Sequence, residues 1–174
     1  MKYMYVLFLG ACLAVMALNA PAKLNQNELN VSGLKNFQIN SETMVSAGLP
    51  DNTHLEVLAK SGVNRVVDLI PGDHQAERQI AESLGMQYHN ISVDWHNPTL
   101  ADFERYTDIM NEAKDNGEVV LTHCKLNWRG SAFTYLYRVT QLNEDEATAR
   151  ADMEAIWTPN ETWRDFIEKV KTAN

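Results

Sequence analysis

The side chains best suited to chemistry in this sequence follow a short apolar run at residues 119–121. His123 and Cys124 are adjacent there, and Arg129 comes five positions after the cysteine. A cysteine thiolate is a strong nucleophile, and a guanidinium binds oxyanions through paired N–H groups. This spacing predicts nucleophilic attack by Cys124 on a bound anion, with Arg129 holding the anion.

The turn that carries these residues joins a predicted buried strand to a predicted helix over residues 131–141. Backbone N–H groups of a tight loop and of the first helical turn point at one spot, and the helix dipole favours negative charge there. A thiol at that spot is expected to be a thiolate near neutral pH and an activated nucleophile. Asn127 is expected to adopt the positive φ that such a loop needs, a role that glycine usually fills.

The elements around this turn alternate between strands and helices. Short β-branched runs predict strands, and apolar residues spaced three or four apart predict helices. Strands are predicted at residues 64–70, 86–93 and 119–121, and helices at residues 73–84, 99–116, 131–141, 144–157 and 163–170. Thr99 is the expected N-cap of the second of these helices. This order predicts an α/β fold with a central, mostly parallel sheet flanked by helices on both faces. In such sheets the ligand site lies beyond the carboxyl ends of the strands.

Length and composition indicate one globular domain. The chain has 174 residues, of which 45% are hydrophobic and 22% are charged. These values exclude a disordered chain and a disulfide scaffold. The net charge is −8 and no basic run is present, which argues against nucleic-acid binding because phosphate contacts supply most of that affinity.

The loop from His123 to Ser131 resembles the phosphate-binding loop of the cysteine-dependent protein tyrosine and dual-specificity phosphatases. From about residue 36 to residue 172, the order of elements is similar to the small bacterial dual-specificity-phosphatase-like domain, the kind also found linked to β-lactamase-like hydrolases. Residues 46–50 are similar to the entry segment of that group, and residues 91–98 to the segment that holds its general acid. The resemblance implies the cysteine-phosphatase fold for a domain over residues 36–174.

The resemblance also implies a role for each residue of the site. Cys124 would attack phosphorus and form a phosphocysteine, and Arg129 would clamp two phosphate oxygens. His123 would orient the loop, Asp94 would protonate the leaving oxygen, and Ser131 would assist departure of the thiolate. The residues expected to bind the substrate phosphate are Lys125, Leu126, Asn127, Trp128, Arg129 and Gly130. No cofactor is implied, and no His, Cys or Asp cluster with metal-ligand spacing is found.

The loop departs from the C-x5-R pattern of these phosphatases, since four residues separate Cys124 from Arg129. Two alignments remain open. One residue is deleted from the loop, which aligns Tyr137 with a tyrosine common in the following helix of dual-specificity enzymes. Alternatively, the loop keeps its length, so that Ser131 matches the usual Ser or Thr and Gly130 takes the place of the arginine. Either change displaces a guanidinium for which a shift of about 1 Å can cost on the order of 10²-fold in rate.

Several neighbouring residues have two interpretations. Asp94 is the predicted general acid, but it could instead cap the helix that follows, and His96 could deliver the proton in its place. Trp95 and Trp128 could line a pocket and stack on a planar substrate, or they could be packing residues. Asp73 and His74 follow a strand on the same rim of the sheet, where a solvated loop is expected.

We therefore expect a phosphatase that hydrolyses phosphomonoesters through Cys124. Its substrate is expected to be a phosphorylated small molecule or protein that the sequence does not name. Two alternatives remain open. Rhodanese-type sulfurtransferases resemble this site, because their cysteine loop often has the C-x4-R spacing and carries a persulfide. A non-catalytic relative would instead bind an anion or a partner through the same loop.

Residues 1–22 have the pattern of a secretory signal peptide: a positive start, an apolar run and a final Ala-Pro-Ala. We expect cleavage after Ala22, a periplasmic or secreted protein, and no stable membrane insertion after cleavage. Lipidation at Cys12 and an uncleaved membrane anchor are the alternatives. Residues 23–35 are polar and are expected to form a linker or N-terminal segment before the domain.

Overall fold

The structure, a computed structural model, describes residues 22–174. Residues 1–21, which carry the apolar part of the predicted signal peptide and Cys12, lie outside this range, so export and lipidation stay predictions. Among the described residues, no helix is long and apolar enough to cross a membrane.

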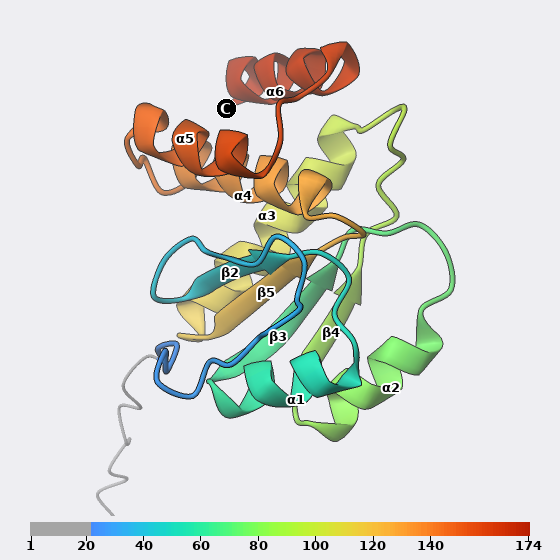
Figure 1. Cartoon of the computed structure of the whole chain (residues 1–174). Helices are drawn as coiled ribbons and strands as arrows, with labels where there is room; N and C mark the ends of the chain where they lie inside the picture. The colour runs from blue at the N-terminus through green and yellow to red at the C-terminus, as the bar shows by residue number, and fades with distance from the viewer. Residues whose placement is uncertain (1–21) are drawn as a thin grey trace, which may run out of the picture.

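Five strands form one sheet in the order β1-β2-β5-β3-β4 (Figure 1). The strands are β1 Gln38–Ile39, β2 Met44–Ala47, β3 Val63–Asp68, β4 Gln87–Asn90 and β5 Val119–His123. β2, β3, β4 and β5 are parallel, and the short β1 pairs antiparallel with β2 at one edge. The carboxyl end of β5 therefore lies in the middle of the sheet, and Cys124 follows it directly.

Six helices cover the two faces of the sheet (Figure 1). One face carries α1 Asn52–Lys60 and α2 Gln75–Ser83. The other face carries α3 Leu100–Asp115 and α4 Trp128–Thr140, and an outer layer of α5 Glu146–Ile156 and α6 Glu161–Ala173 packs on α4. This arrangement confirms the α/β fold with a mostly parallel sheet that the sequence predicts.

The start of α3 is set by local hydrogen bonds. Thr99 is the N-cap: its hydroxyl accepts the N–H of Asp102, and the Asp102 carboxylate accepts the N–H of Thr99. This reciprocal pair satisfies two of the free N–H groups at the helix start. Thr99 is thus confirmed as the cap, and the alternative that Asp94 caps this helix is wrong.

Helix α4 begins three residues earlier than the sequence pattern predicts. Asn127 precedes it with φ 61°, in the left-handed region, and Trp128 is the first helical residue. This confirms the positive φ expected for Asn127. The helix is buried along most of its length because α5 and α6 cover its outer face (Figure 1). Its sequence therefore lacks the alternation of polar and apolar residues that would show where the helix begins.

The segment 23–35 is not a loose linker, because it packs against the domain. Leu24 and Leu34 are buried among the apolar residues under α1. The Leu24 N–H donates to the Glu42 carbonyl at 2.9 Å, and the Asn25 N–H donates to the Ser61 carbonyl at 2.8 Å. The two buried leucines make these packing contacts, which the mainly polar composition of the segment does not predict.

One carboxylate joins the three helices that cover the second face. Glu146 on α5 accepts hydrogen bonds from Tyr135 on α4 at 2.9 Å, from Arg150 on α5 at 2.6 Å and from Lys171 on α6 at 2.7 Å. The hydrogen bonds from Lys171, Arg150 and Tyr135 lower the pKa of Glu146 from 4.5 to about 2. The carboxylate is partly exposed, so this network contributes modestly to stability.

We predict that Glu146→Gln destabilises the protein at pH 7 and that this difference shrinks as the pH falls from about 4.5 to about 2. The pKa is lower in the folded state, so the unfolded state binds more protons in this window and the stabilisation is lost on acidification. Urea unfolding across this pH range measures it, with Glu154→Gln on the exposed side of α5 as the control. A difference that stays constant with pH would contradict the role of this carboxylate.

Candidate active site

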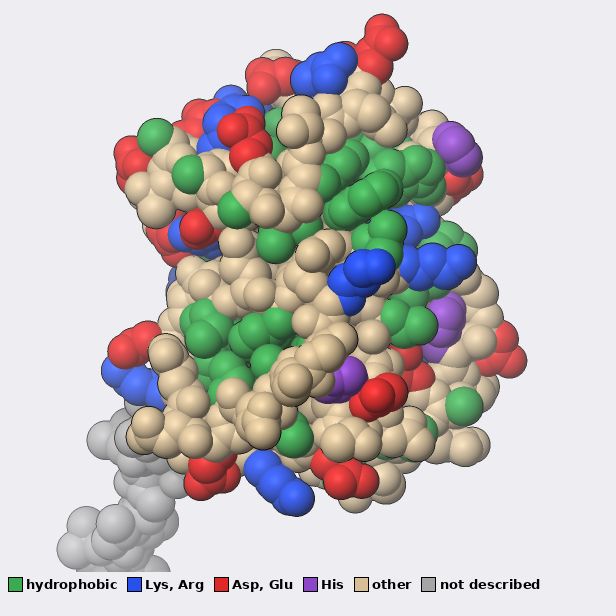
Figure 2. Space-filling view, viewed as in Figure 1, with side chains coloured by type: hydrophobic (Ala, Val, Ile, Leu, Met, Phe, Trp, Pro, Cys, Tyr) green, Lys and Arg blue, Asp and Glu red, His purple; other side chains and the backbone are tan. Residues whose placement is uncertain are grey.

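Cys124 lies directly beyond β5, and its side chain is nearly buried, with 1% of the residue exposed. It lines a cavity of about 210 Å³ together with Trp95, Lys125, Leu126, Trp128 and Arg129. Figure 2 shows lysine and arginine side chains gathered beside the start of α4, next to an apolar area below α6. The structure thus brings the predicted nucleophile and the predicted clamp, Arg129, to one cavity.

The backbone around Cys124 offers several free donors. Leu126 forms an isolated antiparallel bridge with Gly48, whereas the N–H groups of Lys125, Trp128, Arg129 and Gly130 have no acceptor among the described residues. The Ser131 N–H donates to the Asn127 carbonyl at 2.9 Å. These groups belong to a tight loop and to the first turn of α4, whose dipole favours negative charge. They form an anion-binding loop next to the thiol.

Asn127 holds this loop against the rest of the domain. It is fully buried, and its side-chain amide donates to the Asn36 carbonyl at 2.8 Å and to the Ser46 hydroxyl at 2.9 Å. The Asn36 amide in turn donates to the Leu126 carbonyl at 2.8 Å. The loop is therefore fixed to β2 and to the segment before β1, which preorganises its N–H groups.

Gly130 is required by the position of Asn127. A Cβ atom at residue 130 would overlap the Asn127 Oδ1 atom. No side chain, and in particular no arginine, fits at this position while Asn127 keeps its place. Arg129 is accordingly the arginine that reaches the cavity, as both alignments of the loop require.

The Arg129 side chain is held from the segment between β4 and α3. Its Nε donates to the Val93 carbonyl at 3.0 Å, and its guanidinium carbon lies 5.5 Å from the centre of the Trp95 ring. Its two terminal nitrogens have no partner among the described residues. A guanidinium fixed through Nε and a cation–π contact keeps its outer N–H groups available for an anion.

Four tryptophans pack around the cavity wall. The Trp95 ring lies 5.6 Å from Trp128, 5.3 Å from Trp157 and 5.2 Å from Trp163, measured between ring centres. The Trp163 indole also donates to the Trp95 carbonyl at 3.0 Å, and Trp163 is fully buried. Trp95 and Trp128 therefore have both of the roles that the sequence left open: they line the cavity, and they pack against α5 and α6.

Ser131 and Asp94, two further predicted site residues, do not line the cavity. The Ser131 hydroxyl is buried, donates to the Trp128 carbonyl at 3.2 Å and accepts from the Trp157 indole at 3.1 Å. Asp94 is exposed, and its carboxylate accepts the His96 N–H at 2.8 Å. The roles proposed for Ser131 and Asp94 stay predictions that these contacts do not support.

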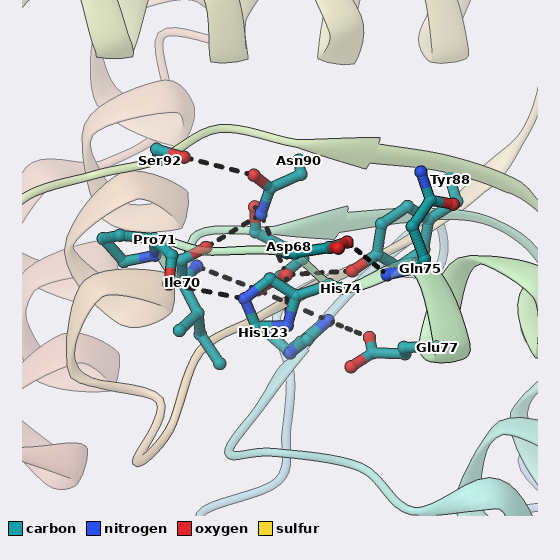
Figure 3. Close-up of polar contacts among 11 residues, drawn as sticks. Asp68, Ile70, Pro71, His74, Gln75, Glu77, Tyr88, Asn90, Ser92 and His123 are labelled. Atoms are coloured by element: carbon teal, nitrogen blue, oxygen red, sulfur yellow. Dashed lines mark hydrogen bonds and ion pairs between the residues drawn. The ribbon is translucent and has the colours of Figure 1, made fainter.

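A buried polar network lies behind the loop (Figure 3). Asp68, at the end of β3, is fully buried and accepts the Ile70 N–H at 2.8 Å, the Tyr88 hydroxyl at 2.9 Å and the Asn90 amide at 2.9 Å. Burial and the negative charge of Asp68 raise the pKa of Tyr88, which stays a donor. These three hydrogen bonds hold the Asp68 side chain in place.

His123 lies between two carboxylates of this network (Figure 3). Its Nε2 is 2.7 Å from Glu77 Oε1 and 3.9 Å from Asp68 Oδ1. The short Glu77 contact is an ion-pair distance without hydrogen-bond alignment, because the ring N–H does not point along it. His74 is half-buried 3.6 Å from Asp68, so it is not the solvated residue expected, whereas Asp73 is exposed.

Sequence reasoning assigned no role to Asp68 or Glu77. An acidic residue inside an apolar strand is a signal for Asp68, but nothing in the α2 sequence marks Glu77. Within residues 22–174, no group of three or more His, Cys, Asp and Glu side chains is arranged to hold a metal ion.

Comparison with known proteins supports the fold. Two crystal structures of a DUF442 protein from Shewanella putrefaciens CN-32, provisionally named a phosphatase, match with 32% and 30% identity and TM-scores of 0.70 and 0.73. The matches cover 81% and 84% of this chain, and 92% and 97% of those chains.

More distant structures match as well. TpbA from P. aeruginosa is 21% identical over 88% of this chain and 94% of that chain, with a TM-score of 0.66. The catalytic domain of SIW14 from S. cerevisiae is 15% identical over 80% and 91%, with a TM-score of 0.66. No protein-family model matches the chain, and no curated protein matches it in sequence. The cysteine-phosphatase fold predicted from the sequence is confirmed.

We predict that Gly130→Ala lowers the free energy of unfolding by roughly 1–3 kcal/mol, because the added methyl must displace the Asn127 side chain. Asn127→Gly keeps the left-handed φ and removes the obstruction, at the cost of two buried hydrogen bonds. The double variant should therefore lose less stability than the two single variants combined. Urea unfolding of the four proteins measures this coupling, and additive losses would contradict the packing described.

Proposed function

Because the chain belongs to the DUF442 family, within the cysteine-phosphatase fold, we propose that it is a cysteine-dependent phosphatase that hydrolyses phosphomonoesters. The observation that carries the proposal is the set of free N–H groups around buried Cys124, in one cavity with Arg129. Two structural neighbours support a phosphatase: TpbA was solved with phosphotyrosine, and SIW14 is named a PP-IP phosphatase.

The proposed reaction has two steps. The loop N–H groups and the outer N–H groups of Arg129 bind the phosphate oxygens, and the Cys124 thiolate attacks phosphorus. A P–S bond forms, the P–O bond to the leaving group breaks, and the electron pair departs on that oxygen. Water then attacks the phosphocysteine, releases phosphate and restores the thiolate. The donors are in place before reaction, which is the arrangement that stabilises developing charge most effectively.

Both alternatives raised by the sequence use the same loop. A sulfurtransferase would carry a persulfide on Cys124, and a non-catalytic relative would bind an anion without turnover. Of these two alternatives, the C-x4-R spacing favours the sulfurtransferase. Thiocyanate formation from thiosulfate and cyanide identifies the sulfurtransferase, and anion binding without either reaction identifies the non-catalytic relative.

We also propose that the protein is exported, on the sequence pattern of residues 1–22. The expected mature chain begins at Lys23 and is found in the periplasmic or secreted fraction. Intact mass measurement of the fractionated protein tests this. A lipid mass on Cys12 would indicate the lipoprotein alternative, and an uncleaved chain in the cytoplasm would contradict export.

We predict that the purified protein releases phosphate from an aryl phosphate under reducing conditions between roughly pH 5 and pH 8. Cys124→Ser should abolish turnover because it removes the nucleophile. Arg129→Ala should lower kcat/KM by about 10²-fold, and Arg129→Lys should restore little of it, since an ammonium cannot replace a bidentate guanidinium.

Arg105→Ala is the matched control, because Arg105 is exposed on α3 away from the loop. Its turnover should equal that of the unchanged protein. Turnover that persists in Cys124→Ser would show that this cysteine is not the nucleophile, and the proposed function would then be wrong.

A further inference from the structure

We propose that the groove between α1 and α2 is a second subsite of the active site, which binds the polypeptide next to a phosphorylated residue and selects apolar and cationic side chains there. This inference rests on the proposed phosphatase function and names a substrate class for the same site. It follows from where the groove meets the catalytic cavity and from the side chains that line it.

The groove is open to an apolar ligand. It has a volume of about 380 Å³ and is lined by α1, by α2 and by the segments that precede them. Its apolar lining includes Leu49, Ile70 and Ile80. Leu49 is 50% exposed and is one of two exposed large hydrophobic side chains within residues 22–174. Removing such a side chain from water is favourable, so the groove suits an apolar group of a substrate.

The groove and the catalytic cavity meet at Lys125, which lines both. Lys125 follows Cys124 directly in the chain. An extended polypeptide advances roughly 3.3–3.6 Å per residue, so the residues next to a phosphorylated residue can reach the groove while its phosphate lies on the anion-binding loop.

The wall between the groove and the loop is formed before a substrate binds. The Leu49 N–H donates to the Lys125 carbonyl at 3.3 Å, and the Gly48 N–H donates to the Lys35 carbonyl at 2.6 Å. A Cβ atom at Gly48 would lie 2.9 Å from the Lys35 Cβ atom, so glycine permits this close approach. Leu49 is thereby held beside the loop, which lowers the entropy cost of binding a substrate there.

The charged side chains of the groove differ from those of the cavity. The groove is lined by the acidic residues Asp73 and Glu77, whereas the cavity is lined by Arg129 and shares Lys125 with the groove. Asp73 is exposed, and its Oδ1 accepts the Gln75 N–H at 3.0 Å, which fixes it at the start of α2. In Figure 2, acidic and histidine side chains lie below the gathered lysine and arginine side chains. A phosphate with a cationic side chain beside it matches both parts of this surface.

A polypeptide fits this combination better than a polyphosphorylated small molecule does. Neighbouring side chains of a polypeptide can supply an apolar group for Leu49 and a cation for Asp73. A second phosphate placed over the groove would instead face Asp73 and Glu77, and like charges repel. The groove therefore favours a phosphorylated protein among the substrates expected for this site.

The test compares kcat/KM of the full chain for three phosphotyrosine peptides and for phenyl phosphate, which has no flanking residues. On both sides of the phosphotyrosine, the peptides carry leucine and arginine, leucine and glutamate, or serine only. We expect the leucine–arginine peptide to exceed the leucine–glutamate peptide on the order of tenfold, with the serine peptide between them.

Substitutions of Asp73 test the charge selection. Asp73→Asn keeps an acceptor for the Gln75 N–H and should reduce the preference for arginine over glutamate by about threefold. Asp73→Lys should abolish or reverse this preference, because attraction of arginine becomes repulsion. Asp108→Lys makes the same change of charge at an exposed position on α3, on the opposite face of the sheet, and should leave the preference unchanged.

Leu49→Ser tests the apolar selection. It should lower kcat/KM for both leucine peptides by about fivefold, without changing the ratio between them or the rate with the serine peptide. An equal loss with all three peptides would indicate damage to the catalytic loop and would contradict the role of Leu49 in the groove.

The outcomes separate this inference from the proposed function. Turnover of phenyl phosphate with equal kcat/KM for the three peptides, or with a preference for arginine that persists in Asp73→Lys, would overturn the subsite and leave the phosphatase function intact. Faster turnover of inositol hexakisphosphate than of any peptide would overturn it as well. If neither the peptides nor phenyl phosphate releases phosphate, the proposed function fails and this inference fails with it.

Discussion

The left-handed conformation of Asn127 is the constraint on which the site depends. A residue with φ 61° turns the chain from β5 into α4 within three residues of Cys124. The same residue uses its side-chain amide to fasten the loop to Asn36 and Ser46. Its Oδ1 is buried without a partner among the described residues and lies over Gly130. An unpaired buried oxygen costs about 1–3 kcal/mol, and the two bonds of the amide offset that cost.

The tryptophan cluster extends this constraint to the opposite wall of the cavity. Arg129 leaves the loop and contacts the Val93 carbonyl and the Trp95 ring, while Trp163 on α6 holds the Trp95 carbonyl. The guanidinium is therefore positioned by the C-terminal helices through Trp95, and not by the loop alone. The Arg129 guanidinium is fixed in space because these packed rings leave it little freedom.

Local signals predict the parts of this arrangement that are formed by neighbours in sequence. The cap Thr99 and the positive φ of Asn127 could be predicted because each rests on the intrinsic properties of one or two residues. Contacts between distant segments left no such signal. The bond from Arg129 to the Val93 carbonyl and the position of Glu77 against His123 join elements far apart in the chain.

The N-terminal half of the sheet was harder to predict for a related reason. β1 and β2 occur in a segment that mixes polar and apolar residues, and β2 is nevertheless buried on both faces. Its serine and alanine fit there because Ser46 accepts the Asn127 amide, which satisfies a hydroxyl that the core would otherwise penalise. A strand whose polar residue contacts the anion-binding loop cannot be recognised until that contact is known.

Two carboxylates behind the loop lie close to the His123 ring. Nε2 faces two carboxylate oxygens, at 2.7 Å from Glu77 and 3.9 Å from Asp68. Neither contact is aligned as a hydrogen bond, so the two carboxylates lie against the ring edge. Two negative charges this close would by themselves disfavour a bound anion beside Cys124. The dipole of α4 and the free loop N–H groups act in the opposite direction, which is why the anion-binding loop lies where the helix begins.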